Sequence, residues 1–351
     1  DRSLVVGWLP ALRRRPLLLV GVGLLALAAA LVAGVSLGNV PVAATDTLAL
    51  LAHRLFGWPV SASWPASAET IIVELRLPRV FTAMATGVAL ALAGETFQGL
   101  LRNPLADPYV LGTASGAALG AALAMLLPIQ VAVLGFGVLH LMAFTGALLA
   151  VAVVYRLSRL GGLSSLTSVL LTGYAVGSLL AAGLALTMYL SGSNLRQIFF
   201  YLLGSFSLSS WPQIAVGFPI IAAGSAVILL RARSLNGLLL GEETAAHLGL
   251  DVRRERLLLL AAATLVTAVA VAMSGLIGFV GLVVPHLVRL VVGPDARVLL
   301  PLSALFGASF LAFADLVARM PGELPVGIVT AVVGAPFFLY LLGRYRAGYA
   351  L

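Results

Sequence analysis

Ten long apolar stretches recur along the chain, and they constrain its fold more than any other feature. A helix needs roughly 20 mostly apolar residues to cross about 30 Å of hydrocarbon, and each stretch is close to that length. The composition agrees, since 61% of the 351 residues are hydrophobic and only 10% are charged. We therefore predict an all-α polytopic membrane protein with ten transmembrane helices, at about 17–37, 78–99, 109–128, 131–154, 166–190, 213–230, 256–274, 276–292, 298–318 and 326–343.

The arginines predict which side of the membrane each loop faces. All 21 basic residues are arginine, and an even number of spans puts both termini on one side. If that side is the cytoplasm, 16 of the 21 arginines lie in cytoplasmic loops, as the positive-inside rule requires. The expected topology is N-in and C-in. The five arginines left outside are Arg54, Arg76, Arg79, Arg196 and Arg319.

The chain lacks the residues that several classes of function would need. The chain has no cysteine, which excludes a thiolate metal site. It has no lysine either, so it cannot hydrolyse ATP through a Walker A loop. The formal charge of +8 fits membrane topology better than nucleic-acid binding. A proton-coupled secondary transporter would need buried acids at mid-membrane, whereas Glu95, His286 and Asp315 lie near span ends. The residues thus indicate a pore subunit that a partner energises.

The stretch "GEETAAHLGL" (241–250) is a charged island between apolar runs. It has the pattern of a short helix, because Glu242 and Glu243 suit the positive end of the helix dipole and Gly249 can stop the helix. The predicted topology places it in a cytoplasmic loop at about 231–255. The whole chain, 1–351, is expected to form one transmembrane domain that includes this loop, with outer segments at about 38–77, 191–212 and 319–325.

Several motifs resemble those of one transporter family. They are "RLPR" (76–79), "ALAGETFQGLLRNPLADPYVLGTASGAALGA" (91–121), "LGEETAAHLGL" (240–250), "SGLIGFVGLVVPHLVRLVVGPDARVLLP" (274–301) and "ADLVAR" (314–319). In this order they resemble the type II permease subunits of ABC importers for iron-siderophores, heme and cobalamin. The likeness runs from about residue 70 to 343, and members of that family also have ten spans.

The resemblance implies an assembly in a bacterial inner (cytoplasmic) membrane. Two copies of the chain would form a homodimer with two ATP-binding cassette subunits, fed by a periplasmic substrate-binding protein. ATP and Mg would bind to the partner ATPase, and this chain would be no enzyme and would hold no cofactor or metal. The island would fold into two short helices that sit in a groove of the ATPase. The coupling residues would be Glu242, Glu243, Ala246, Leu248 and Gly249, with Ala245 adding apolar surface.

The resemblance also assigns the outer arginines and a gate. Arg76, Arg79 and Arg319 would pair with glutamates of the binding protein, because the planar guanidinium grips a carboxylate bidentately; alternatively, Arg79 only anchors its span at the interface. Ser165, Leu166 and Thr167 would form the cytoplasmic gate at the dimer axis. The residues by themselves allow a plainer reading, in which Ser164 or Ser165 is a helix N-cap.

Two acids and the cargo complete the expectations. Asp315 is expected to form an i,i+4 pair with Arg319, while Glu95 meets water near the cytoplasmic face or is protonated. The pore is expected along spans 5 and 10 and a linking helix near 191–208. The cargo would be an iron-bearing chelate, heme or a ferric siderophore, with cobalamin as the alternative and proton-coupled secondary transport as the rival of another class.

Overall fold

The chain is a bundle of helices, most of them long and apolar. The computed structural model describes residues 16–38, 40, 42–58, 66–127, 132–133, 136–160, 166–320 and 322–348. Within these ranges seven helices are long and apolar enough to cross a membrane, and three shorter apolar helices match the other three predicted spans. The expectation of an all-α protein is confirmed, with one two-residue hairpin as an exception.

The first part of the chain supplies the central helix of the bundle. Its elements are α2 (Pro16–Ser36), α3 (Ala44–Phe56), α4 (Ala66–Thr70), the π-helix η1 (Ile71–Arg76) and α5 (Leu77–Leu100). The last three run on as one helix, and nearly every residue of α5 is buried. With 24 residues, α5 extends over about 36 Å at a rise of about 1.5 Å per residue. It therefore reaches from one end of the bundle to the other.

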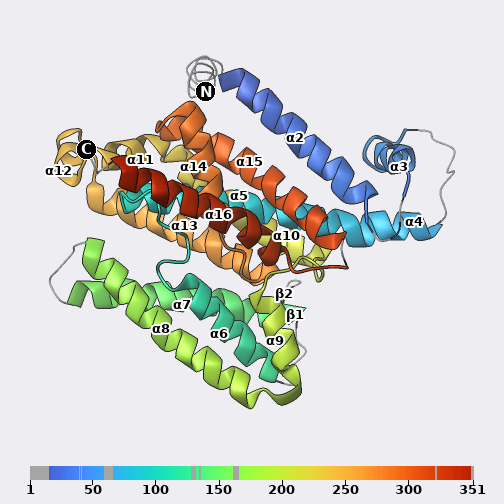
Figure 1. Cartoon of the computed structure of the whole chain (residues 1–351), viewed down its shortest axis with the longest axis horizontal. Coiled ribbons are helices and arrows are strands. Elements are labelled where there is room, and N and C mark those ends of the chain that lie inside the picture. Colours follow the sequence, from blue (N-terminus) through green and yellow to red (C-terminus); the bar gives the residue numbers. More distant parts are fainter. Residues whose placement is uncertain are drawn as a thin grey trace.

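A second group of helices lies side by side as a layer below the others in Figure 1. It comprises α6 (Thr113–Leu126), the strands β1 (Ala132–Val133) and β2 (Phe136–Gly137), α7 (Val138–Leu160), α8 (Leu166–Leu190), the 3-10 turn η2 (Gly192–Asn194) and α9 (Leu195–Leu202). The strands pair antiparallel, with Ala132 opposite Gly137. The helix α7 begins seven residues later than the predicted window 131–154, because the hairpin occupies its first part.

The last part of the chain completes the upper layer in Figure 1. It comprises α10 (Trp211–Leu230), α11 (Ala232–Leu239), α12 (Glu242–His247), α13 (Val252–Ser274), α14 (Val280–Val292), α15 (Ala296–Arg319) and α16 (Val326–Gly348). In this view α11 and α12 lie at the left, which we call the α12 end of the bundle. The helices α3 and α4 lie at the right, which we call the α4 end. The helices α2, α5 and α15 run between these two ends.

Glycines set how closely the helices of the core approach. A Cβ at Gly87 of α5 would lie 2.2 Å from the carbonyl oxygen of Gly307 in α15. One at Gly94 would lie 1.9 Å from the carbonyl oxygen of Gly281 in α14. Because lipid is as apolar as a leucine side chain, helices in a membrane associate through such close backbone packing. These contacts hold α14 and α15 against α5.

Two irregular segments, 101–112 and 275–279, enter the interior of the bundle. They precede α6 and α14, which is why both helices are shorter than their predicted windows. The Tyr109 hydroxyl joins the segments, since it donates to the Ile277 carbonyl oxygen at 3.0 Å and accepts from the Ile277 amide at 3.3 Å. Non-helical backbone is tolerated at membrane depth where protein groups satisfy it, and this bond supplies part of that satisfaction.

Candidate functional site

The helix α12 begins and ends with residues that suit its short length. Glu242 and Glu243 lie in its first turn. After the helix, Gly249 has φ +82°, the left-handed conformation in which a glycine costs little. The Gly249 amide donates to the Ala246 carbonyl (2.9 Å) and the Leu250 amide to the Ala245 carbonyl (3.1 Å). These two bonds form a Schellman motif, so the prediction that Gly249 stops the helix is confirmed.

One face of α12 is free and the other packs on its own chain. Glu242, Glu243, Ala246, Leu248 and Gly249 are all exposed, and Leu248 is 63% exposed. Ala245, which we expected to add to this surface, is completely buried within the chain. The correction follows from the helical period, because in a helix this short one face must pack against the bundle. The five predicted coupling residues therefore share an outward surface.

Ion pairs and hydrogen bonds fasten the segment around α12 to the long helices. Arg256 of α13 pairs with Glu242, and Arg231 pairs with Glu255 of α13 at 2.6 Å. In α11, Asn236 donates to the Asp295 carboxylate at 2.7 Å and accepts from the first amide of α15 at 2.8 Å. Both α13 and α15 are thus linked directly to the segment that carries the exposed face of α12.

Asp295 is the N-cap of α15 and lies outside the apolar helices. Its carboxylate accepts from the Arg297 amide at 3.0 Å and from the Arg297 guanidinium at 2.8 Å. The hydrogen bond from the Arg297 side chain is the main reason why the pKa of this carboxyl lies well below its usual range. The charged carboxylate therefore also holds Asn236 in place.

At the α4 end, the structure brings Arg79 and Arg319 together around one buried aspartate. Asp315 is 1% exposed. Arg79 donates to it through Nε (3.0 and 3.1 Å), and Arg79 Nη2 lies 3.0 Å from Asp315 Oδ1. Arg319 Nε lies 3.2 Å from Asp315 Oδ2, one helical turn away, which confirms the predicted i,i+4 pair. The Asp315 carboxylate thus serves as the counter-charge of two arginines.

Arg76 and Arg319 also bind backbone carbonyls at the end of α2. Arg76 Nη1 donates to the carbonyl oxygens of Val35 and Ser36, both at 2.9 Å, and Arg319 Nη2 donates to that of Gly34 at 3.0 Å. All three predicted docking arginines are therefore buried and bonded within the chain. We expected them at the membrane edge. The structure places them in the wall of a hollow at the α4 end.

That hollow, the arginine pocket, has a volume of about 250 Å³. Its polar lining consists of Arg76, Arg79, Arg319, Glu323, Ser207 and Ser209. Three guanidinium groups against the carboxylates of Asp315 and Glu323 leave an excess of positive charge, which suits an anionic group. Sequence reasoning missed Glu323. The only signal for it was its place in the short outer segment 319–325, beside Arg319.

A polar cluster near the α12 end was also missed. Arg289 of α14 donates to Glu95 (2.5 Å) and Gln98 (2.6 Å) of α5, and Gln98 donates to the Gly281 carbonyl at 3.0 Å. Glu95 is therefore paired rather than isolated, which neither of our two expectations described. The available signal for this pair was a similar depth in the membrane, because Glu95 and Arg289 both lie toward the cytoplasmic ends of their predicted spans.

The predicted gate is not placed. Ser165 lies outside the described residues, and so do the side chains of Leu166 and Thr167, which begin α8. All three stay a prediction. Within the described ranges no three His, Cys, Asp or Glu side chains are arranged to hold a metal ion.

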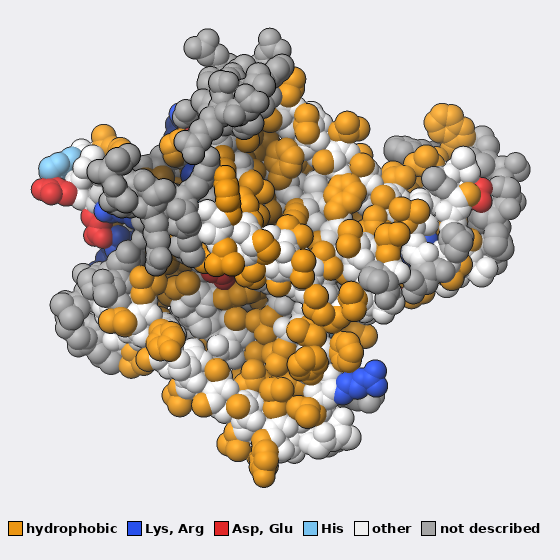
Figure 2. Space-filling view, viewed as in Figure 1, with side chains coloured by type: hydrophobic (Ala, Val, Ile, Leu, Met, Phe, Trp, Pro, Cys, Tyr) orange, Lys and Arg blue, Asp and Glu red, His pale blue; other side chains and the backbone are white. Residues whose placement is uncertain are grey.

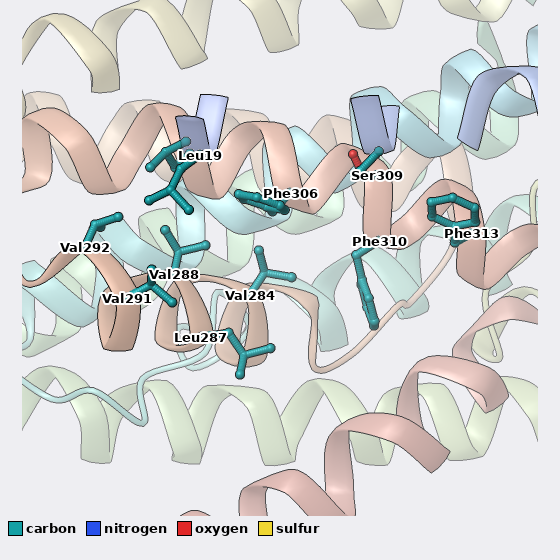
Figure 3. Close-up of a pocket in the computed structure, with 12 residues that line it drawn as sticks. Leu19, Val284, Leu287, Val288, Val291, Val292, Phe306, Ser309, Phe310 and Phe313 are labelled. Carbon is teal, nitrogen blue, oxygen red and sulfur yellow. The ribbon is translucent and has the colours of Figure 1, made fainter. Parts of the chain in front are cut away.

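Two further hollows differ in character. One, the side hollow, has a volume of about 280 Å³ and is lined by residues of α7, α9, α13, the segment after α9 and the segment before α16, among them His140, Tyr201, Ser207, Glu323 and Pro325. The other, about 380 Å³, lies among α2, α14 and α15. Figure 3 shows the leucines, valines and phenylalanines that line it, with Ser309 as the polar residue.

The surface agrees with a membrane setting. Figure 2 shows apolar side chains over the lengthwise helices and acidic, basic and histidine side chains gathered at the α12 end of the same face. A surface this apolar needs lipid or a partner to cover it.

Comparison with known proteins is consistent with this arrangement. Residues 24–344 match the FecCD transport family. The chain is 48% identical over 285 residues to a cobalamin import system permease protein of Halobacterium salinarum, covering 81% of this chain and 76% of that protein. It is 43% identical to a hemin transport system permease protein of Yersinia pestis, covering 79% and 84%. A solved inward-facing ABC transporter assigned to the metal-chelate type superimposes with a TM-score of 0.79 at 32% identity, covering 94% and 99%.

Proposed function

Because the chain belongs to the FecCD transport family and is the permease subunit of an ABC importer for chelated substrates, we propose that its cargo is an iron-bearing chelate, either heme or a ferric siderophore. A periplasmic binding protein delivers this cargo, and a separate ATPase supplies the energy. In this proposal the chain has ten spans, N-in and C-in, in a bacterial inner membrane. It works as a homodimer, with the pore between the two copies.

The observation that supports an importer with two different partners is the separation of two unlike surfaces. At the α12 end, a short helix presents two acids and an apolar face to the outside. At the α4 end, three arginines line a hollow with excess positive charge. The helix α5 links the two ends directly, since Arg79 belongs to its first turn and Arg102, just after it, donates to the Leu238 carbonyl of α11 at 3.2 Å.

Each surface fits one partner of an importer. The exposed face of α12 fits a groove on the ATPase, where Leu248 would be covered and Glu242 and Glu243 would meet basic residues. The arginine pocket fits acidic residues of the binding protein, because an arginine fork grips a carboxylate bidentately. Arg76, Arg79 and Arg319 are already held by the chain, so they would meet a partner with little loss of side-chain entropy.

Cobalamin import is the second candidate for the cargo. It is favoured by the relative at 48% identity, which is named for cobalamin, whereas the relative named for hemin is 43% identical. Both cargoes are bulky metal chelates carried whole, and one importer architecture would serve either.

The test is uptake into liposomes that contain the permease, its ATPase and its binding protein. Labelled heme, a ferric siderophore and cobalamin are supplied in parallel, with ATP inside. The proposal expects uptake of one of the iron chelates that depends on ATP and on the binding protein. Uptake of cobalamin alone would support the second candidate. ATP-independent uptake driven by a proton gradient would overturn both and favour a secondary transporter.

A further inference from the structure

Arg79 is held firmly on one edge and loosely on the other. Its Nε and Nη2 atoms bind Asp315 at 3.0–3.1 Å. Its Nη1 atom lies 3.6 Å from Glu323 Oε1, and the Glu323 side chain is 48% exposed. Asp315 is buried and Glu323 is not, so an incoming carboxylate could replace only Glu323. The Nη1 edge of Arg79 can therefore exchange Glu323 for another carboxylate, while the other edge stays bound to Asp315.

The backbone at Glu323 is strained. Glu323 has φ +60°, a left-handed conformation that a residue with a Cβ rarely adopts. The turn is bonded to the end of α15, through the Leu324 amide to the Ala318 carbonyl at 2.9 Å and the Glu323 amide to the Arg319 carbonyl at 3.4 Å. The contact with Arg79 thus helps to hold a conformation that the residue does not favour by itself.

Glu323 also stands between two hollows. Glu323 and Ser207 line both the arginine pocket and the side hollow. Helix α16 begins three residues after Glu323, and its first amides, Val326 and Gly327, donate to the carbonyls of Gly204 (3.0 Å) and Leu203 (3.1 Å). A movement of Glu323 would therefore be passed to the start of α16 and to the wall of the side hollow.

We propose that Glu323 is a positioning residue that occupies Arg79 until a carboxylate of the binding protein takes its place. The proposal rests on the docking role of the arginine pocket given above. Displacing Glu323 lets the Nη1 edge of Arg79 bond to the carboxylate of the partner and frees the strained turn before α16. The formal charge facing the partner rises by one when Glu323 leaves. Docking and the start of α16 are then linked by a single residue.

The experiment measures the affinity of the cognate binding protein for the permease–ATPase complex in nanodiscs at low salt. Glu323→Gln removes the competing charge, so binding should tighten by about two- to fivefold, as for an exposed ion pair. Glu323→Ala should act in the same direction. The control is Glu69→Gln, which removes one half-exposed carboxylate from the same end, where it pairs with Arg54 at 2.6 Å. It should leave the affinity within twofold.

The sign of the effect separates this role from a structural one, because a merely structural residue would weaken binding when changed. Combining Glu323→Gln with Arg79→Ala tests the pairing, since the gain should vanish once Arg79 is absent. If Glu323→Gln and Glu323→Ala leave binding unchanged or weaker while Arg79→Ala weakens it, the positioning role is refuted and docking stands. If Arg79→Ala does not weaken binding, docking itself is refuted.

Discussion

The turn at Gly249 offers a sharp test of the role of α12. Gly249 has φ +82°, and a Cβ added to it would meet no heavy atom within 4 Å. Within the chain itself, any cost of a substitution is therefore conformational rather than steric. Placing a residue with a Cβ in the left-handed region costs about 1–2 kcal/mol, whatever the size of the side chain. We expect Gly249→Ala and Gly249→Leu to act alike, and Gly249→Asn to be milder because asparagine tolerates this conformation.

The same cost shifts the equilibrium between the closed and the opened Schellman turn. A change of 1–2 kcal/mol corresponds to a factor of about 5–30 in that population. The Leu250 amide would then no longer hold the Ala245 carbonyl, and the exposed face of α12 would lose the orientation that the proposed docking on the ATPase requires. Cargo-stimulated ATP hydrolysis and uptake in liposomes should both fall. The decrease should reach the same factor if the closed and opened turns differ little in free energy.

A matched control lies at the other end of the molecule. Gly57 ends α3 with φ +64°, donates its amide to the His53 carbonyl, and has nothing within 4 Å of an added Cβ. Gly57→Leu introduces the same strain far from α12 and should leave uptake near the wild-type level. The reasoning fails if Gly249→Leu transports normally. It also fails if Gly249→Leu is far worse than Gly249→Ala, because size would then matter.

Three further predictions concern stability. Asp315→Asn leaves two buried arginines with only the half-exposed Glu323 as a nearby counter-charge and should destabilise the protein by about 3–5 kcal/mol, seen as a lower Tm; an unchanged Tm would contradict the pairing. Gly94→Leu forces a side chain onto backbone that a Cβ would meet at 1.9 Å, so overpacking of roughly 3 kcal/mol or more should reduce folded yield, whereas Gly21→Leu, with nothing within 4 Å, should not. The pKa of Asp295 is lowered by its hydrogen bond with Arg297. The stabilising contribution of Asp295 is therefore present above the pKa of an unfolded aspartate, about 3.9, and is lost as the pH falls below that value. Between about pH 4 and pH 2, the wild type should lose more Tm than Asp295→Asn, and equal losses would refute this.

The helices and the α12 turn could be predicted because their causes are local. A run of apolar residues in lipid must satisfy its own backbone, and a helix does so within the segment. The acids that open α12 and the glycine that closes it likewise act within ten residues. Hydropathy marked the beginning of a span less well where apolar residues form irregular backbone, as in 101–112 and 275–279. An apolar sequence looks the same in both conformations.

The partners of the charged side chains were decided by the tertiary structure. The amino-acid sequence by itself predicted that five arginines lie on the side where arginines are rare, and it showed that Glu95 lies in an apolar run. It did not determine that Arg79 meets Asp315, 236 positions later, or that Arg289 meets Glu95, 194 positions earlier. In a membrane helix the faces toward lipid and toward other helices are both apolar, so periodicity does not reveal which helix lies opposite. Close backbone contacts such as Gly87 with Gly307 select the neighbours, and only those contacts bring the arginines and Glu323 to one pocket.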